Sequence, residues 1–304
     1  MIPFKSPELS DRPWVESLLA AEPAPTPEYS FSGIYLWSRA YSQRIARFGE
    51  RLLVRVVGSL GPAYLYPAGA GPLAPALDAL GADAAAQGLP LLLVCVTGEQ
   101  KAAMEAACPG RFAFEPHRDS FDYLYDIHRL ADLPGKKLHA KRNHIHRFDE
   151  RFPDWLLEPI TPANVPECVE LERRWAAIRQ EEAGEDTETI SEETVAVIEA
   201  LYHMDALGLE GALIRGSGSP VAFSLGGLIT PECFDVNFEK SFGDIQGAYA
   251  VINRELARLV RARHPQVKWL NREDDMGLEG LRRAKLSYYP DLLLTKYIVR
   301  EVMA

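Results

Sequence analysis

The fold of this chain is decided by residues 209–240, which read LEGALIRGSGSPVAFSLGGLITPECFDVNFEK. Three runs rich in apolar and β-branched residues predict strands at 209–216, 220–229 and 233–240. The first two runs are separated by Gly-Ser-Gly-Ser at 216–219, which is typical of a tight hairpin. The segment therefore predicts three consecutive antiparallel strands.

The elements on either side extend this pattern to a complete domain. The sequence predicts a strand at 155–160, helices at 162–182 and 192–207, and an acidic loop between them at 181–189. After the three strands it predicts a helix at 247–264, a strand at 267–271, a helix at 274–286 and a last strand at 292–299. This order is that of an N-acetyltransferase (GNAT)-like fold.

The first half of the chain has a similar but less complete order. It predicts strands at 51–58, 63–69, 91–96 and 121–127, with helices at 75–87 and 98–108. A length of 304 residues favours two domains. We therefore predict an α/β (α+β) protein with two tandem GNAT-like domains. Residues 1–133 form a degenerate domain, 134–152 a basic linking helix, and 153–304 the domain with the active site.

Composition narrows the classes of function. The formal net charge is −10 and the pI is about 5.3, which disfavours indiscriminate nucleic-acid binding. The four cysteines are scattered without a C-x-x-C pair, so neither a disulfide framework nor a metal site is expected. The sequence shows no secretory signal and no run of roughly 18–20 apolar residues. We expect a cytoplasmic protein without a transmembrane segment.

Positive charge is nevertheless concentrated in the basic segment, residues 136–148, which reads KKLHAKRNHIHRF. A Pro-Gly pair before it and Pro153 after it predict a helix of about four turns. Its apolar stripe comprises Leu138, Ile145, Phe148 and Phe152. The other faces are basic, which is consistent with binding of a polyanion such as RNA or with a simple solvated helix face.

Two other places carry candidate chemistry. Alternation along 233–240 puts Asp235, Asn237 and Glu239 on one face of a strand, either as a buried polar group or as a solvated sheet edge. In the helix at 274–286, Lys285 continues an apolar stripe. Its amine can face a cleft, where it would stabilise an oxyanion, or extend to water.

A donor of the acetyl-CoA type is disfavoured by the loop before the helix at 247–264. GNAT enzymes bind pyrophosphate there with a [QR]-x-x-G-x-[GA] loop. Residues 244–249 read DIQGAY, which keeps the glycine at Gly247 but has Asp244 and Tyr249 at the outer positions. An acidic side chain near a pyrophosphate is unfavourable, and a bulky one impedes close approach.

The chain resembles a bacterial family related to the C-terminal domain of phosphatidylglycerol lysyltransferase. The resemblance spans nearly the whole chain and is carried by residues 136–148, 238–240, 247–255 and 271–290. It implies tandem GNAT-like domains, aminoacyl-tRNA as donor, and a tRNA-binding role for the basic segment. Lys285, before Tyr288-Tyr289-Pro290, resembles a lysine near the C-terminus of the lysyltransferases. The membrane-spanning half of those enzymes is not part of the resemblance.

We therefore expect an acyltransferase that moves an aminoacyl group from aminoacyl-tRNA to an amine or hydroxyl of a small molecule, peptide or lipid headgroup, without a cofactor. An acyl-CoA-dependent N-acyltransferase and a non-catalytic anion-binding protein are the alternatives. The expected catalytic residues are Lys285, for the oxyanion or the leaving 3′-oxygen, and Glu239 and Asp274, either of which would hold or deprotonate the nucleophile. The expected substrate-binding residues are Lys137, Lys141, Arg142, Asn143, His146, Asn237, Lys240, Arg272 and Tyr288.

Overall fold

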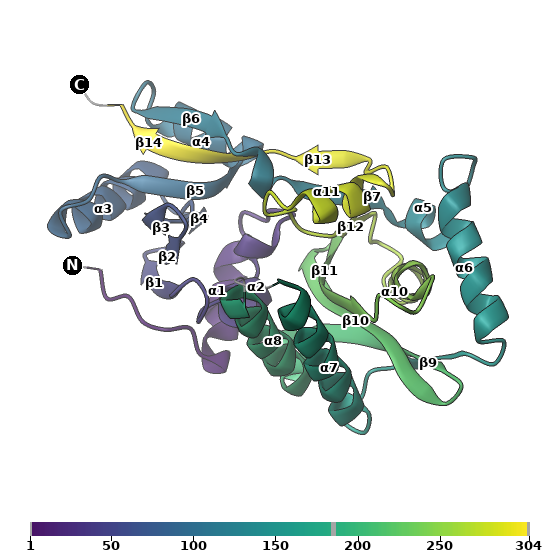
Figure 1. Ribbon diagram of the computed structural model, residues 1–304. Helices are drawn as coiled ribbons and strands as arrows, with labels where there is room; N and C mark the ends of the chain where they lie inside the picture. Colours follow the sequence, from purple (N-terminus) through teal and green to yellow (C-terminus); the bar gives the residue numbers. More distant parts are fainter. Residues whose placement is uncertain (1, 184–186, 303–304) are drawn as a thin grey trace. The chain divides into compact units, whose positions relative to one another are not determined.

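The chain folds into two compact units, both interleaved in sequence (Figure 1). The computed structural model describes residues 2–183 and 187–302. The first unit comprises Met1–Tyr123, Asp274–Arg282 and Leu293–Ala304, and the second comprises Leu124–Glu273 and Arg283–Leu292. The predicted domains were continuous, whereas these units exchange segments, and the predicted linking helix lies inside the second unit.

The second unit contains the predicted GNAT-like order. Its sheet has the strand order β13-β7-β12-β11-β10-β9-β8, seven strands in the described part of the chain. Strands β8 to β11 pair antiparallel and β11 pairs parallel with β12. The strands are β7 (Asp122–Asp126), β8 (Leu156–Pro159), β9 (Leu209–Gly216), β10 (Ser219–Thr230), β11 (Cys233–Ser241), β12 (Trp269–Asn271) and β13 (Leu292–Leu294).

Helices connect these strands in the expected places. α7 and α8 lie between β8 and β9 in the chain, and α10 lies between β11 and β12 (Figure 1). The helices are α5 (Ile127–Asp132), α6 (His139–Arg151), α7 (Val165–Ala183), α8 (Thr187–Tyr202), α9 (Met204–Leu207), α10 (Ala248–Arg263) and α11 (Glu279–Leu286). None of the described helices is long and apolar enough to cross a membrane.

Three boundaries differ from the prediction. The predicted acidic loop is helical at both ends, in α7 and α8, and its centre at 184–186 lies outside the described residues. The predicted helix at 192–207 is divided into α8 and α9. The helix expected from Asp274 begins at Glu279, because Asp274 and Asp275 accept backbone hydrogen bonds two residues on, from Met276 and Gly277.

A one-residue bulge interrupts β11. The register against β10 shifts between the pairs Leu225–Phe238 and Gly227–Asp235. Opposite the bulge stands Gly226, where a Cβ atom would lie 1.9 Å from the Asp235 carbonyl oxygen. A bulge reverses the alternation of side chains beyond it. The unbroken alternation predicted for 233–240 is therefore wrong.

Contacts with α10 show the reversal. Phe234 contacts His264 at the end of α10, with ring centroids 6.4 Å apart, and Glu239 accepts a hydrogen bond from Asn253 on α10. In an unbroken strand these two side chains would point to opposite faces. The solvated-edge alternative is also wrong, since β11 is a central strand and its polar side chains are largely buried.

The first unit is built on a second sheet, of order β1-β2-β3-β5-β14-β6 with β4 beside β2. Its strands are β1 (Arg44–Phe48), β2 (Arg51–Gly58), β3 (Gly61–Tyr64), β4 (Ala68–Gly69), β5 (Leu92–Thr97), β6 (Phe112–Pro116) and β14 (Lys296–Glu301). Its helices include α1 (Arg12–Leu19), α2 (Phe31–Leu36), α3 (Leu73–Ala86) and α4 (Gly98–Ala107).

The predicted last strand at 292–299 is in fact two strands in different sheets. β13 lies at one edge of the second unit's sheet, whereas β14 lies between β5 and β6 of the first. A buried ion cluster holds β14 in place: the Lys296 amine lies 2.7 Å from Glu28 Oε1 and 2.7 Å from Asp122 Oδ1. Buried carboxylates require such a partner, because desolvation of an unpaired charge is costly.

In the second unit, the basic segment packs closely on the start of α10 (Figure 1). Gly247 precedes α10 with φ +89°, and a Cβ atom there would lie 2.1 Å from the His144 carbonyl oxygen of α6. Arg151 of α6 donates a 3.0 Å hydrogen bond to the Asp244 carbonyl. The predicted apolar stripe of α6 is buried as expected. α6 thus lies directly against Gly247 of the loop that would hold a pyrophosphate in an acetyltransferase, while Gly243, Asp244 and Gln246 of that loop are exposed.

Gly247→Ala is expected to destabilise the protein by about 2 kcal/mol or more, because the methyl group meets a carbonyl and the backbone has a positive φ. Thermal unfolding measures the effect. Gly243→Ala is the matched control, since nothing lies within 4 Å of its added Cβ. Equal melting temperatures for the two variants would contradict the close packing of α6 on α10.

Candidate active site

The centre of the candidate site is the guanidinium of Arg272. Arg272 directly follows β12, beyond the point where β11 and β12 pair. Its Cζ atom lies 5.0 Å from the ring centroid of Tyr288 and 5.9 Å from that of Tyr125. Its Nη2 donates to Glu239 Oε1 at 2.9 Å. The end of one strand thus brings a cation against a carboxylate and two aromatic rings.

Glu239 is held at both oxygens. Oε2 accepts from Asn253 Nδ2 at 3.0 Å, while Oε1 accepts from Arg272. The carboxylate comes from β11, beyond the bulge, and the amide comes from α10. Glu239 therefore has a fixed orientation within the site.

Lys285 is buried, and its amine points inward. Its side chain is only 8% exposed, and Nζ donates a short hydrogen bond to the Arg272 carbonyl. Tyr125 in turn donates to the Lys285 carbonyl at 2.8 Å. The interpretation in which the amine extends to water is wrong. Leu278, from the stripe expected to be buried, is half exposed.

Lys141 belongs to the same cluster. Its Nζ lies 3.9 Å from the centroid of the Tyr288 ring, so one ring carries both Lys141 and Arg272. Burial and, next, the charge of Arg272 lower the pKa of Lys141 to about 8, against a smaller opposing effect of Glu239. The sequence assigned Lys141 to phosphate binding on the basic segment; the structure gives it a position beside the candidate catalytic groups.

Two buried polar atoms of this cluster lack a hydrogen-bond partner among the described residues. They are Nη1 of Arg272 and Oδ1 of Asn253. Unsatisfied buried groups cost about 1–3 kcal/mol each and are uncommon. A donor and an acceptor match a ligand that carries a carbonyl or anionic oxygen together with an amine or hydroxyl. The predicted residue Asn237 has its own contact within β11, where its amide donates to Asp235 at 2.6 Å.

Three other predicted residues are used elsewhere. Asp274 belongs to the first unit, where its charge acts on buried Lys296. Lys240 is buried over the Trp175 ring and pairs with Glu193 at 2.8 Å. Arg142 donates to the carbonyls of Leu133 and Gly135, so it holds the turn before α6. Arg142 therefore has a structural contact where a phosphate contact was expected.

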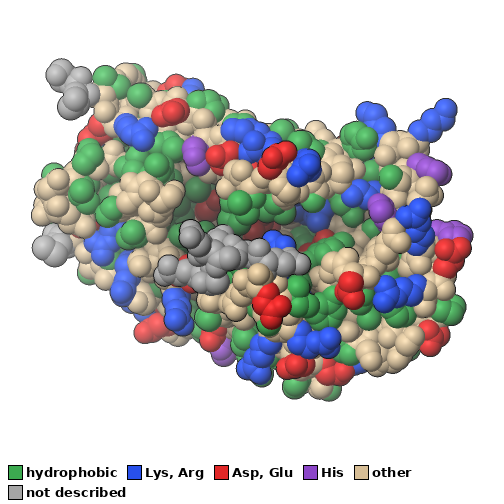
Figure 2. Space-filling model, viewed as in Figure 1, with side chains coloured by type: hydrophobic (Ala, Val, Ile, Leu, Met, Phe, Trp, Pro, Cys, Tyr) green, Lys and Arg blue, Asp and Glu red, His purple; other side chains and the backbone are tan. Residues whose placement is uncertain are grey.

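The outer face of the basic segment is exposed. Lys137, Asn143 and His146 lie on it, as predicted. Figure 2 shows Lys, Arg and His side chains gathered over α6. Further exposed basic residues are Lys136, His139, His144, Arg147 and Arg151, with Asp149 and Glu150 near the end of the helix. Lys137 lies 5.4 Å from the centroid of the Tyr289 ring, beside the Lys141–Tyr288 pair.

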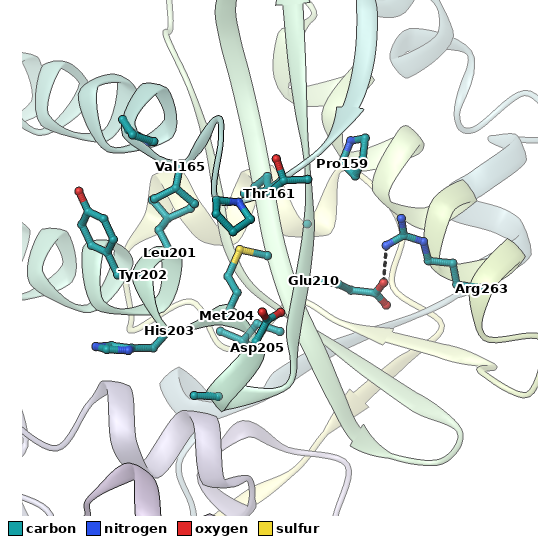
Figure 3. A pocket seen from close by; sticks show the side chains of 16 residues that line it. Pro159, Thr161, Val165, Leu201, Tyr202, His203, Met204, Asp205, Glu210 and Arg263 are labelled. Carbon is teal, nitrogen blue, oxygen red and sulfur yellow. Dashed lines mark hydrogen bonds and ion pairs between the residues drawn. The ribbon is translucent and has the colours of Figure 1, made fainter.

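A separate hollow of about 570 Å³ lies between the starts of α7 and β9 and the end of α8 (Figure 3). Its rim includes His203, Asp205 and the ion pair between Glu210 and Arg263. No predicted site residue lines it. No group of His, Cys, Asp or Glu in the described ranges is arranged to hold a metal ion.

Sequence reasoning missed Tyr125 and Asn253. Asn253 stands among buried positions of α10, after Val251 and Ile252, and a polar residue at such a position was the available signal. No local signal marks Tyr125, because its role depends on pairing of β7 with β12, far along the chain. Such a contact is not encoded in local periodicity.

The fold and the arrangement of the site support an acyltransferase. The chain belongs to the family described as "Phosphatidylglycerol lysyltransferase, C-terminal", which matches residues 21–300. The resemblance inferred from the sequence is confirmed.

Two solved structures share the fold of this chain. A conserved protein of unknown function from Bacteroides thetaiotaomicron is 37% identical, with a TM-score of 0.91 over 99% of this chain and all of that one. L-PGS from Bacillus licheniformis is 13% identical, with a TM-score of 0.65 over 97% of this chain and 92% of that one.

One curated relative is similar in sequence. An uncharacterised protein from Mycoplasmoides gallisepticum is 22% identical over 195 residues, or 61% of this chain. The match spans 58% of the length of that relative.

Lys285→Met is expected to lower the free energy of unfolding by about 1–3 kcal/mol, because the buried Arg272 carbonyl loses a charged donor. Lys268→Met is the control, since that side chain is 62% exposed and should change stability by at most about 0.5 kcal/mol. Chemical denaturation measures both. A neutral Lys285→Met variant would restore the interpretation in which the amine reaches water.

Proposed function

We propose that this protein transfers an aminoacyl group from aminoacyl-tRNA to an amine or hydroxyl acceptor. The family is named for lysyl transfer to phosphatidylglycerol, which supports the reaction class. Because aminoacyl-tRNA is a cytoplasmic donor, the proposal puts the reaction in the cytoplasm.

The observation that carries the proposal is the packing of α6 on the start of α10. A helix N-terminus with a glycine-rich loop is the ordinary site for a pyrophosphate. Here the His144 carbonyl occupies the space beside Gly247, and Arg151 binds the Asp244 carbonyl. The same helix that contacts this loop presents an exposed basic face. The geometry favours a polyanionic donor on α6 over an acyl-CoA beneath it.

The chemistry needs little beyond positioning. An aminoacyl ester is already activated, so the enzyme must orient the acceptor and stabilise the tetrahedral oxyanion. We assign the oxyanion to the unpartnered Nη1 of Arg272, whose backbone Lys285 holds. We assign the amine or hydroxyl of the acceptor to the unpartnered Oδ1 of Asn253. The amide nitrogen of Asn253 donates to Glu239, which sets the orientation of that side chain. Asp274 has no part in this scheme.

The acceptor carries a group that can donate a hydrogen bond to an amide oxygen. A small molecule, a peptide amine and a lipid headgroup all meet this requirement, and no cofactor is needed. An acyl-CoA donor and a non-catalytic anion-binding role remain the competing functions, and the donor assay below distinguishes all three.

The assay measures loss of a mixture of ¹⁴C-aminoacyl-tRNAs in the presence of a small-molecule and lipid extract of bacterial cells. We expect the protein to accelerate this loss and to produce a labelled product, whereas ¹⁴C-acetyl-CoA should yield none. Acetyl transfer would favour the acyl-CoA function. tRNA binding with neither transfer would favour a binding protein.

Changing Lys136, Lys137 and Arg147 together to Glu should weaken binding of unfractionated tRNA at least tenfold and reduce its salt dependence, by about 0.9 in log–log slope per lost phosphate contact. The control makes the same charge change at Arg47, Lys268 and Arg300, which are exposed and do not belong to the basic segment. Filter binding between 50 and 200 mM salt measures both. Equal losses would indicate that only net charge matters.

A further inference from the structure

The side chain of Lys141 differs from those of its neighbours in the basic segment. Lys136, Lys137 and Arg147 are exposed, whereas Lys141 is half-buried with its amine over the face of Tyr288. Among the described residues, no hydrogen bond or ion pair involves its Nζ. An aromatic face attracts an ammonium group without accepting its proton, so the nitrogen remains available to a substrate.

We propose that Lys141 is the general base that removes the proton from the acceptor during aminoacyl transfer. This inference rests on the proposed function and names a residue for a step that the sequence assigned to Glu239 or Asp274. Glu239 has both oxygens occupied by Arg272 and Asn253. Asp274 belongs to the first unit. Within the cluster of the second unit, Lys141 is the group whose lone pair can be freed.

The surroundings of Lys141 favour its neutral form. The charged and titratable groups that face it are Tyr288, Arg272 and Glu239. Burial and Arg272 bring its pKa to about 8, so roughly a quarter of molecules carry a neutral amine at pH 7.5. A base with a pKa near the working pH is the most effective proton acceptor.

The step balances without any further reactant. The lone pair of the acceptor nitrogen or oxygen attacks the ester carbonyl carbon while its proton passes to the Lys141 amine, which becomes an ammonium. The carbonyl oxygen carries the negative charge beside Arg272. Collapse of this intermediate breaks the bond to the ribose oxygen of the tRNA. That oxygen takes the proton back from Lys141, which returns to its neutral form.

Competitive labelling measures the protonation of the Lys141 amine in the absence of substrate. The protein and Nα-acetyl-lysine amide are labelled together with trace isotopic acetic anhydride from pH 6.5 to 11, and peptides are quantified by mass spectrometry. Lys141 should reach half-maximal reactivity near pH 8, against about 10.4 for the free standard. Arg272→Gln, if folded by its melting curve, should move the Lys141 midpoint upward. A midpoint above pH 10 in the parent protein would overturn the proposal.

The pH profile of transfer tests the role. Because the unprotonated amine acts, the rate should rise with pH and level off above about pH 8. Lys141→Arg keeps the positive charge but cannot release its proton, so transfer should fall at least about a hundredfold while tRNA binding is retained. Lys268→Arg, at an exposed position, should leave transfer unchanged.

The two measurements distinguish a failure of the base assignment from a failure of the proposed function. If Lys141 labelling has its midpoint near pH 8 but the protein consumes no aminoacyl-tRNA, both the proposed function and the base assignment are rejected. Active transfer that survives Lys141→Arg, or a variant profile identical to the parent profile, would reject Lys141 as the base and leave the proposed function intact.

Discussion

Burial of the Arg272 guanidinium is the constraint on which the second unit depends. A guanidinium out of water is tolerated only with compensating partners, and here they come from four places in the chain. Glu239 supplies charge from β11, Tyr125 and Tyr288 supply ring faces, and Lys285 binds the Arg272 carbonyl. Each partner is in turn held by another element, so the cluster fixes the relative positions of β7, β11, α10 and α11's last turn. The orientation of each side chain in the cluster is therefore set by contacts within the protein itself.

α6 lies against the loop that precedes α10, where this fold commonly has a ligand-binding loop. The general architecture offers a helix N-terminus to a pyrophosphate, and a single glycine at that place allows close approach. In this chain the approaching group is the backbone of α6 at His144. The same packing leaves the opposite face of the helix outward, with its histidines and with Arg147 and Arg151. One contact between two helices therefore puts the α6 backbone beside Gly247 and leaves a basic face of the helix exposed.

Sequence reasoning recovered what depends on local pattern. The element order of the second unit and the apolar stripe of α6 follow from periodicity and capping. Arg272, Glu239, Lys285 and Tyr288, which the sequence named as candidates, lie in one cluster of the structure. The bulge in β11 was not foreseeable, because Val236 and Asn237 continue an ordinary strand pattern and the extra residue is defined only against β10. The contacts of Lys141 were missed for a related reason. The sequence shows on which face of a helix a charged residue lies, but tertiary packing determines which side chains contact that face.

The exchange of β14 has a consequence for the order in which the chain can fold during synthesis. β5 and β6 do not pair with each other; β14 separates them, and its Lys296 neutralises the buried carboxylates Glu28 and Asp122. Until the ribosome has released residues 296–301, the first sheet has two unpaired strand edges in its interior and two acids without their cation. Such edges are templates for misassociation. The half of the protein that is made first is thus the half completed last, and a ribosome that stalls late leaves its N-terminal product unfinished.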